Sequence, residues 1–409
     1  MKQQLLLVLA LVVLLSAGAF ATDTRVVTMG DNNLVLLDEA NIFLFPSRVL
    51  EYPNLAVGEF SGDDFTEFGI HWKFGEENPW VMATYFSTRP EGVPVDFLGN
   101  PLGNLTELGD EHKRVDLFYG RKMGDYKFGF HFGYSRTKYE EVDQTILLTI
   151  EEKQYFYDFG FGLTQMDGNW DLAVDIGFGG WTDQNGGGEE ETEPWKFVQF
   201  SGLFRHFRDM GPDWTLIEHI GTFIGYRGET DHVIGDGVPA TTADYEARQK
   251  LLDLELGLGA NWTPSSKVLA VADFGLMYQS LKIDQDFSAA YTGGAAAENE
   301  VTRSGWSEFW KIGIDAEVFK WLDVRMGATS DWISVKDETG SIMQLTTLTT
   351  QKSQYANNET YLGFGFHWGD FHLDTYTDPD LFLRGFDFIN GKSTNSDMNF
   401  RISAVYEMK

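Results

Sequence analysis

Charged side chains recur at every second position in many extended stretches of this 409-residue chain, opposite apolar side chains. Successive side chains of a strand point to opposite faces, so these charges share one face. Mixed acidic and basic groups around a narrow watery path create a field that filters solutes by charge and dipole. Alternatively, the same groups pair with one another and brace the wall. Strand parity predicts a lumen-lining set: Lys73, Arg114, Asp116, Lys127, Asp158, Asp171, Asp175, Arg205, Asp253, Glu255, Asp273, Lys311, Asp315, Glu317, Asp323, Arg325, Asp331 and Arg401.

The histidines form no catalytic pattern with acids or serines. A hydrolase needs a histidine beside an acid or a nucleophile at a common rim. His206 and His219 flank a short turn, and His232 lies between Asp231 and Asp236 without a recognisable spacing. The chain has no cysteine, which excludes a thiolate zinc site and a cysteine nucleophile. We therefore predict no enzymatic activity, no catalytic residue, no metal and no cofactor.

Two connections have unusual compositions. Residues 180–194 carry five acidic side chains and no basic one, but the run of glycines and the spacing match no calcium loop. We interpret this stretch as a solvated acidic tip. Residues 378–397 are apolar enough to predict an inward fold, a partner contact or a binding surface for a greasy substrate. The possible constriction residues are Leu381, Phe382, Arg384, Phe386 and Phe388.

The elements that position these residues are amphipathic strands. Lys250–Thr263 shows the pattern most clearly, with four leucines, an alanine and Trp262 on one face and Asp253, Glu255 and glycines on the other. In an outer-membrane barrel the apolar face meets lipid and the polar face meets the lumen. Glycine on the polar face suits a curved wall around water. Only two stretches, Trp80–Ser87 and Trp214–Arg227, mix the faces.

The connections between the predicted strands alternate between short and long. Short links such as Gly124-Asp125 alternate with long ones such as residues 87–111, and only residues 61–65 break the size rule. Short periplasmic turns and long outer loops are typical of an outer-membrane barrel. The count predicts about 16 antiparallel strands, or 14 if the first hairpin belongs to an N-terminal piece.

Export and composition agree with this architecture. Residues 1–21 have a basic start, an apolar run and the cleavage site Ala19-Phe20-Ala21, which predicts a secretory signal peptide. Six tryptophans near the short links predict an interfacial girdle: Trp80, Trp170, Trp214, Trp262, Trp321 and Trp368. The formal net charge of −31 makes nucleic acid an unsuitable partner.

Residues 22–53 do not alternate and predict a folded, plug-like or periplasmic N-terminal segment before the barrel at 54–409. The order Met29-Gly30, Asp38, Asn41 and Pro46 resembles the opening of FadL/PorV-like outer-membrane barrel proteins. The chain departs from that pattern where Asp31 and Asn32 follow Met29-Gly30 and where Phe45 precedes Pro46. The resemblance implies a barrel of 14 strands with an N-terminal segment that tucks into it or caps it.

The sequence predicts a porin-like channel in the outer membrane of a Gram-negative envelope, passing small polar solutes. One alternative is a FadL-like transporter of hydrophobic substrates. Another is a PorV-like scaffold barrel that works with a secretion partner. The expected partners are outer-membrane lipid and small solutes, with a homo-oligomer or a secretion partner as further possibilities.

Overall fold

The structure is a computed structural model, and it describes residues 23–61, 65–88, 111–143, 148–184, 190–233, 243–287, 297–341, 349–377 and 400–408. The predicted signal peptide lies outside these ranges. So do the predicted constriction residues Leu381, Phe382, Arg384, Phe386 and Phe388. None of the described helices is long and apolar enough to cross a membrane.

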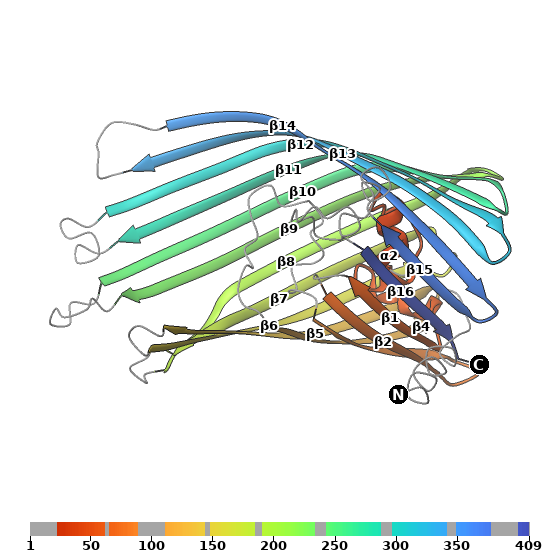
Figure 1. The fold of residues 1–409 in the computed structure, drawn as a ribbon, viewed down its shortest axis with the longest axis horizontal. Helices are drawn as coiled ribbons and strands as arrows, with labels where there is room; N and C mark the ends of the chain where they lie inside the picture. Colours follow the sequence, from red (N-terminus) through yellow and green to blue (C-terminus); the bar gives the residue numbers. More distant parts are fainter. Residues whose placement is uncertain are drawn as a thin grey trace, which may run out of the picture.

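Sixteen antiparallel strands form a closed barrel in chain order, and β1 pairs with β16 to complete it (Figure 1). This confirms the prediction of 16 strands. The alternative of 14 is wrong, because the first hairpin pairs on both sides as part of the wall. The strands are β1 Leu55–Ser61, β2 Phe65–Phe74, β3 Trp80–Ser87, β4 Glu111–Met123, β5 Tyr126–Asp143, β6 Leu148–Gln165, β7 Trp170–Gln184, β8 Glu190–Gly211, β9 Trp214–Val233, β10 Ala243–Ser265, β11 Val268–Phe287, β12 Ala297–Phe319, β13 Leu322–Ser341, β14 Thr349–Trp368, β15 Phe371–Thr377 and β16 Phe400–Glu407.

Several strands are longer than their alternation predicts. Strand β7 continues to Gln184 and β8 begins at Glu190, so most of the predicted acidic loop at 180–194 is paired strand. The predicted bounds of this loop were wrong, because the prediction of a strand required alternating polarity. The solvated acidic tip stays a prediction. A strand that extends beyond the lipid has water on both faces, and its backbone hydrogen bonds are satisfied by its neighbours whatever the side chains.

The outer face of the wall is a band of exposed apolar side chains bordered by aromatic rings. Leu254, Leu256 and Leu258 are 46%, 60% and 51% exposed on one face of β10. Below them, the rings of Trp214 and Trp262 stack with centroids 5.5 Å apart. Such a band and girdle are the features of a barrel in contact with lipid. The protein is therefore a β-barrel of the outer membrane.

Residues 23–53, which we call the inner segment, contain three short helices: α2 Asp23–Thr28, η1 Glu39–Ile42 and η2 Pro46–Glu51. Helix η2 contacts β3 to β6, while α2 contacts β13 to β16. One segment that touches strands this far apart around a closed barrel lies within it, at the end of the barrel where β16 ends (Figure 1).

The inner segment explains the stretches whose faces could not be assigned. Val81, Ala83 and Tyr85 of β3 are buried and pack in one cluster with Val49 and Tyr52 of the inner segment. Strand β3 is therefore apolar on both faces, because lipid covers one and the inner segment covers the other. In β9, Ile217 likewise packs on Val35.

Candidate functional site

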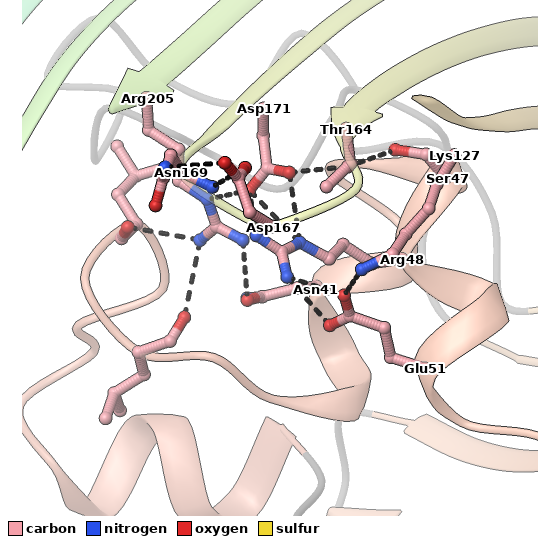
Figure 2. Close-up of polar contacts among 12 residues, drawn as sticks. Asn41, Ser47, Arg48, Glu51, Lys127, Thr164, Asp167, Asn169, Asp171 and Arg205 are labelled. Carbon is pink, nitrogen blue, oxygen red and sulfur yellow. Dashed lines mark hydrogen bonds and ion pairs between the residues drawn. The ribbon is translucent and has the colours of Figure 1, made fainter. Parts of the chain in front are cut away.

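The carboxylate of Asp171 on β7 is the centre of the contact between the inner segment and the wall (Figure 2). Arg48 of η2 donates from Nε to Oδ1 at 3.0 Å and from Nη2 to Oδ2 at 2.8 Å. Arg205 of β8 donates from Nε to Oδ2 at 2.7 Å. Asp171 and Arg205 have no exposed surface, and Arg48 is only 2% exposed. Forked contacts between guanidinium and carboxylate fix orientation as well as distance.

Arg205 binds the inner segment with the rest of its guanidinium group. Nη1 donates to the carbonyl oxygens of Leu34 at 3.1 Å and Leu36 at 3.3 Å, and Nη2 donates to Asn41 Oδ1 at 3.1 Å. The centroid of the Phe45 ring lies 4.2 Å from the guanidinium carbon of Arg205. One wall arginine thus holds the loop before η1, the side chain of Asn41 in η1 and the residue before η2.

The first turn of η2 lies directly on the wall because glycines face it. Thr164 Oγ1 donates to Asp171 at 2.5 Å, so Ser47 Oγ, 2.7 Å away, donates to Thr164. A Cβ atom added at Gly129 of β5 would overlap the backbone of Pro46 and Ser47, and one at Gly162 of β6 would come within 2.7 Å of the Ser47 nitrogen. These glycines were expected to line water. Here they make room for the backbone of the inner segment.

The end of η2 is fixed by a second set of charges. Glu51 accepts from Arg48 Nη1 at 2.7 and 2.8 Å and from Lys127 Nζ of β5 at 2.6 Å. Burial alone would raise the pKa of Glu51, but the Arg48 guanidinium and the Lys127 ammonium bring it below its usual value. The ionised carboxylate therefore stabilises this side of the inner segment.

The opposite side of the inner segment is held by Arg25 of α2. Its Nε donates to Asp315 of β12 at 3.1 Å, and its Nη1 donates to Asp38 at 3.2 Å. Asp38 is the N-cap of η1 and forms a capping box with Asn41. Burial raises the pKa of Asp38 to about 6, although Arg25 acts in the other direction. Beside Arg25 lies a cavity of about 450 Å³, lined mainly by polar residues of β10 to β14 and their turns.

The wall also carries two buried charge clusters of its own. On β4 to β6, Arg114 binds Asp116 and Asp158, and His131 Nε2 lies 2.8 Å from Asp116. These two acids and the histidine are close enough together to suit a metal ion. Arg114 already donates to both carboxylates and supplies a positive charge there, so the cluster is an ion-pair network.

On β9 to β11, the second cluster is built around a buried histidine. His219 lies 3.0 Å from Asp273 and 3.3 Å from Glu255.

The predicted lumen-lining residues occupy four kinds of position. Six meet the inner segment: Lys127, Asp171, Arg205, Lys311, Asp315 and Arg401. Seven pair within the wall: Arg114, Asp116, Asp158, Glu255, Asp273, Asp323 and Arg325. Asp253 is inward and buried, and Asp175 and Asp331 are half-buried. Lys73 is exposed at its strand end, and Glu317 pairs with Lys267 at a turn. A role of any of them in solute selection stays a prediction.

Sequence reasoning missed the residues of the inner segment that complete this site. Arg48, Arg25, Ser47 and Glu39 lie outside alternating stretches, so parity gave them no direction. The available signal was the order of Asp38, Asn41 and Pro46. In the structure, Asp38 caps η1, Asn41 accepts a hydrogen bond from Arg205, and Pro46 is the first residue of η2.

Comparison with known proteins gives likeness in structure only. No protein-family model matches the chain, and no curated protein matches it. The toluene transporter TodX of Pseudomonas putida is 10% identical, with 95% of this chain and 98% of that chain covered and a TM-score of 0.44. The ferric yersiniabactin uptake receptor FyuA from Yersinia pestis is 8% identical, with 87% and 80% covered and a TM-score of 0.43. CdiB from Acinetobacter baumannii is 11% identical, with 86% and 59% covered and a TM-score of 0.42.

Proposed function

We propose that this barrel is an outer-membrane transporter of hydrophobic or amphipathic small molecules, with the inner segment as its periplasmic plug. The observation that carries the proposal is the buried, ion-paired contact of η2 with the wall around Asp171. A permanently open pore needs a continuous watery path. Here a segment that contacts the wall on both sides lies inside one end of the barrel, which supports the plug.

The upper part of the inner face supports a substrate with apolar surface. Phe223, Leu251 and Leu281 of β9, β10 and β11 form a buried cluster, with Ile283 against it. Leu251 and Leu281 are register partners on neighbouring strands, one step above Asp253. Binding sites for small apolar molecules combine such side chains with a few polar groups. This patch lies next to the inward acids, which suits a molecule with an apolar body and a polar end.

A channel for small polar solutes, the first prediction from the sequence, is the second candidate. The cavity of about 450 Å³ beside Arg25 favours it, because the cavity lies at the periplasmic end and its lining carries charges of both signs. The two candidates differ in whether the inner segment must move before anything passes.

Planar-bilayer recording of the purified full-length barrel separates the candidates. We expect a closed barrel with rare openings for the plugged transporter. A stable ohmic conductance would support the polar channel instead and contradict the plug.

Substrate class is tested by uptake of a fluorescent fatty acid into cells that express the barrel. Leu251→Asn should lower uptake severalfold, because it places an unpaired amide in the apolar cluster. Leu251→Met keeps the position apolar and should preserve uptake. Equal uptake by both variants would show that the apolar cluster is not part of the transport pathway.

A further inference from the structure

Glu39 of η1 belongs to a buried chain of hydrogen bonds whose geometry requires one additional proton. Glu39 is 2% exposed, and its Oε1 forms a hydrogen bond with the hydroxyl of Tyr85 on β3. The same hydroxyl lies 2.7 Å from Nε2 of His71 on β2. Nδ1 of His71 lies 2.6 Å from the carbonyl oxygen of Tyr52, at the end of η2. The chain therefore links η1, two wall strands and the exit from the inner segment.

Counting hydrogens along this chain shows what it needs. A carbonyl oxygen only accepts, so His71 Nδ1 carries a hydrogen. Tyr85 has one hydrogen, but its oxygen faces both Glu39 and His71 Nε2. If Glu39 is ionised and His71 is neutral, Tyr85 can donate its hydrogen to only one of them. The other acceptor then faces the lone pairs of the Tyr85 oxygen with no hydrogen between the two atoms.

One additional proton satisfies every contact. On Glu39, it lets the acid donate to Tyr85 and Tyr85 donate to His71. On His71, it lets the imidazolium donate to Tyr85 and Tyr85 donate to the carboxylate. Both arrangements have the same number of protons and no net charge, which is the cheaper state to bury.

The surroundings of Glu39 favour keeping that proton. A small cavity beside it is lined by Asp23 at the start of α2, Glu59 of β1 and Glu67 of β2, and its described lining includes no basic side chain. Asp38, the residue before Glu39, adds another carboxylate. Burial raises the pKa of Glu39 well above its usual value, and Asp38, Glu67 and Glu59 add to the effect while the Tyr85 hydrogen bond opposes it.

We propose that the Glu39–Tyr85–His71 chain is a proton-binding site that latches the inner segment, which stays in place only while one extra proton is bound. A group whose pKa is raised in the folded state contributes stability that is fully present below its ordinary pKa and is lost as pH rises through the raised value. The latch therefore holds in mildly acidic surroundings and weakens as the periplasmic side becomes more alkaline. This goes beyond the proposed transport function and holds whatever the barrel carries.

Single-cysteine labelling tests the latch, because the natural chain has no cysteine. Ser47 has no exposed surface, so Ser47→Cys reports release of η2 through its reaction with a water-soluble maleimide. Glu39→Gln imitates the protonated acid, since its amide donates to Tyr85. The ratio of labelling rates between Ser47→Cys and Ser47→Cys/Glu39→Gln cancels the pH dependence of the thiol itself. We expect this ratio to rise by up to about tenfold per pH unit between about pH 5 and the raised pKa.

Glu51→Gln is the matched control, because Glu51 is a carboxylate of the same segment that is paired with Arg48 and Lys127. It should speed labelling of Ser47→Cys by a factor that stays nearly the same at every pH in this range. A Ser47→Cys to Ser47→Cys/Glu39→Gln ratio that stays constant with pH would overturn the latch.

If Glu39→Gln prevents assembly, hydrogen exchange of residues 39–52 in the unmodified protein gives the answer. Protection corrected for intrinsic exchange should fall as pH rises. Protection that is independent of pH would equally overturn the proposal. Both measurements report the position of the inner segment and not transport, so failure of the transport proposal would leave them unchanged.

Discussion

The two ends of the inner segment meet opposite sides of the barrel in different ways. On the η2 side, Arg48 is buried against Asp171 with forked hydrogen bonds, and the backbone of Ser47 lies on Gly162. On the α2 side, the side chain of Arg25 is 20% exposed and makes single contacts of 3.1 and 3.2 Å beside a cavity of about 450 Å³. Glycines face the backbone on both sides, so backbone fit does not distinguish them.

The difference lies in water and in charge pairing. A buried ion pair loses several kcal/mol when one partner is removed, whereas a pair near water is partly replaced by solvent. The η2 side is therefore the anchor of the inner segment, and the α2 side is the end where we expect movement to begin.

The largest expected effect comes from removing one carboxylate on each side. Asp171→Asn leaves Arg48 and Arg205 buried together and should weaken the seating of the inner segment by about 3–5 kcal/mol. Asp315→Asn leaves Arg25 with Asp38, and it should cost about 1–2 kcal/mol. Hydrogen exchange of residues 45–52 for Asp171→Asn and of residues 23–31 for Asp315→Asn measures the two local opening energies. Equal losses would remove the distinction between anchor and mobile end.

A backbone substitution sharpens the role of the glycines on the η2 side. Gly129→Ala places a methyl group against the backbone of Pro46 and Ser47 and should destabilise the seated segment by about 1–3 kcal/mol. Gly221→Ala is the matched control, because its added Cβ would meet Leu203 at 3.6 Å, an ordinary contact. Bilayer conductance should rise for the first variant only. A similar rise for Gly221→Ala would point to a general effect on the wall.

The unmodified protein should show the same asymmetry. Amides of α2 should exchange roughly tenfold faster than those of η2, since the cavity and the partly exposed Arg25 lower the cost of local opening. Mass spectrometry of peptides covering residues 23–31 and 45–52 makes the comparison. Faster exchange in η2 would reverse the assignment.

The smallest expected effect is a severalfold change in hydrogen-exchange rate on acidification. The change has opposite signs on the α2 side and the η2 side. The pKa of Asp38 is raised to about 6, so its contribution is fully present below its ordinary value of 3.8 and is lost as pH rises through about 6. The pKa of Glu51 is lowered from 4.5, so its contribution is present above that value and is lost as pH falls below it.

Acidification from neutrality should therefore first protect the α2 side and only later loosen the η2 side. Exchange measured across this range checks the order, and Asp38→Asn should reduce the first step in α2, while the Glu39 latch continues to protect residues 39–52. A first step of unchanged size in α2 of Asp38→Asn would assign that step to another group, with Glu39 the first to examine.

The sequence by itself determined the wall. Alternation in Lys250–Thr263 predicted which side chains face outward, and Leu254, Leu256 and Leu258 are exposed there while Asp253 and Glu255 are buried. This works because strand period and lipid impose the same local rule at every position. The rule fails where another surface covers the inner face, as in β3, whose two apolar faces only make sense once the inner segment is in place.

Only the tertiary structure decided what the inward charges do. Arg48 and Asp171 are 123 positions apart, and no local pattern connects them. Parity placed Asp171 and Arg205 on the inner face, but it had no means of predicting that a helical turn fills the space before them. Their contact depends on the closure of 16 strands around one segment. That closure turns side chains expected to line water into the buried partners of Arg48 and Asn41.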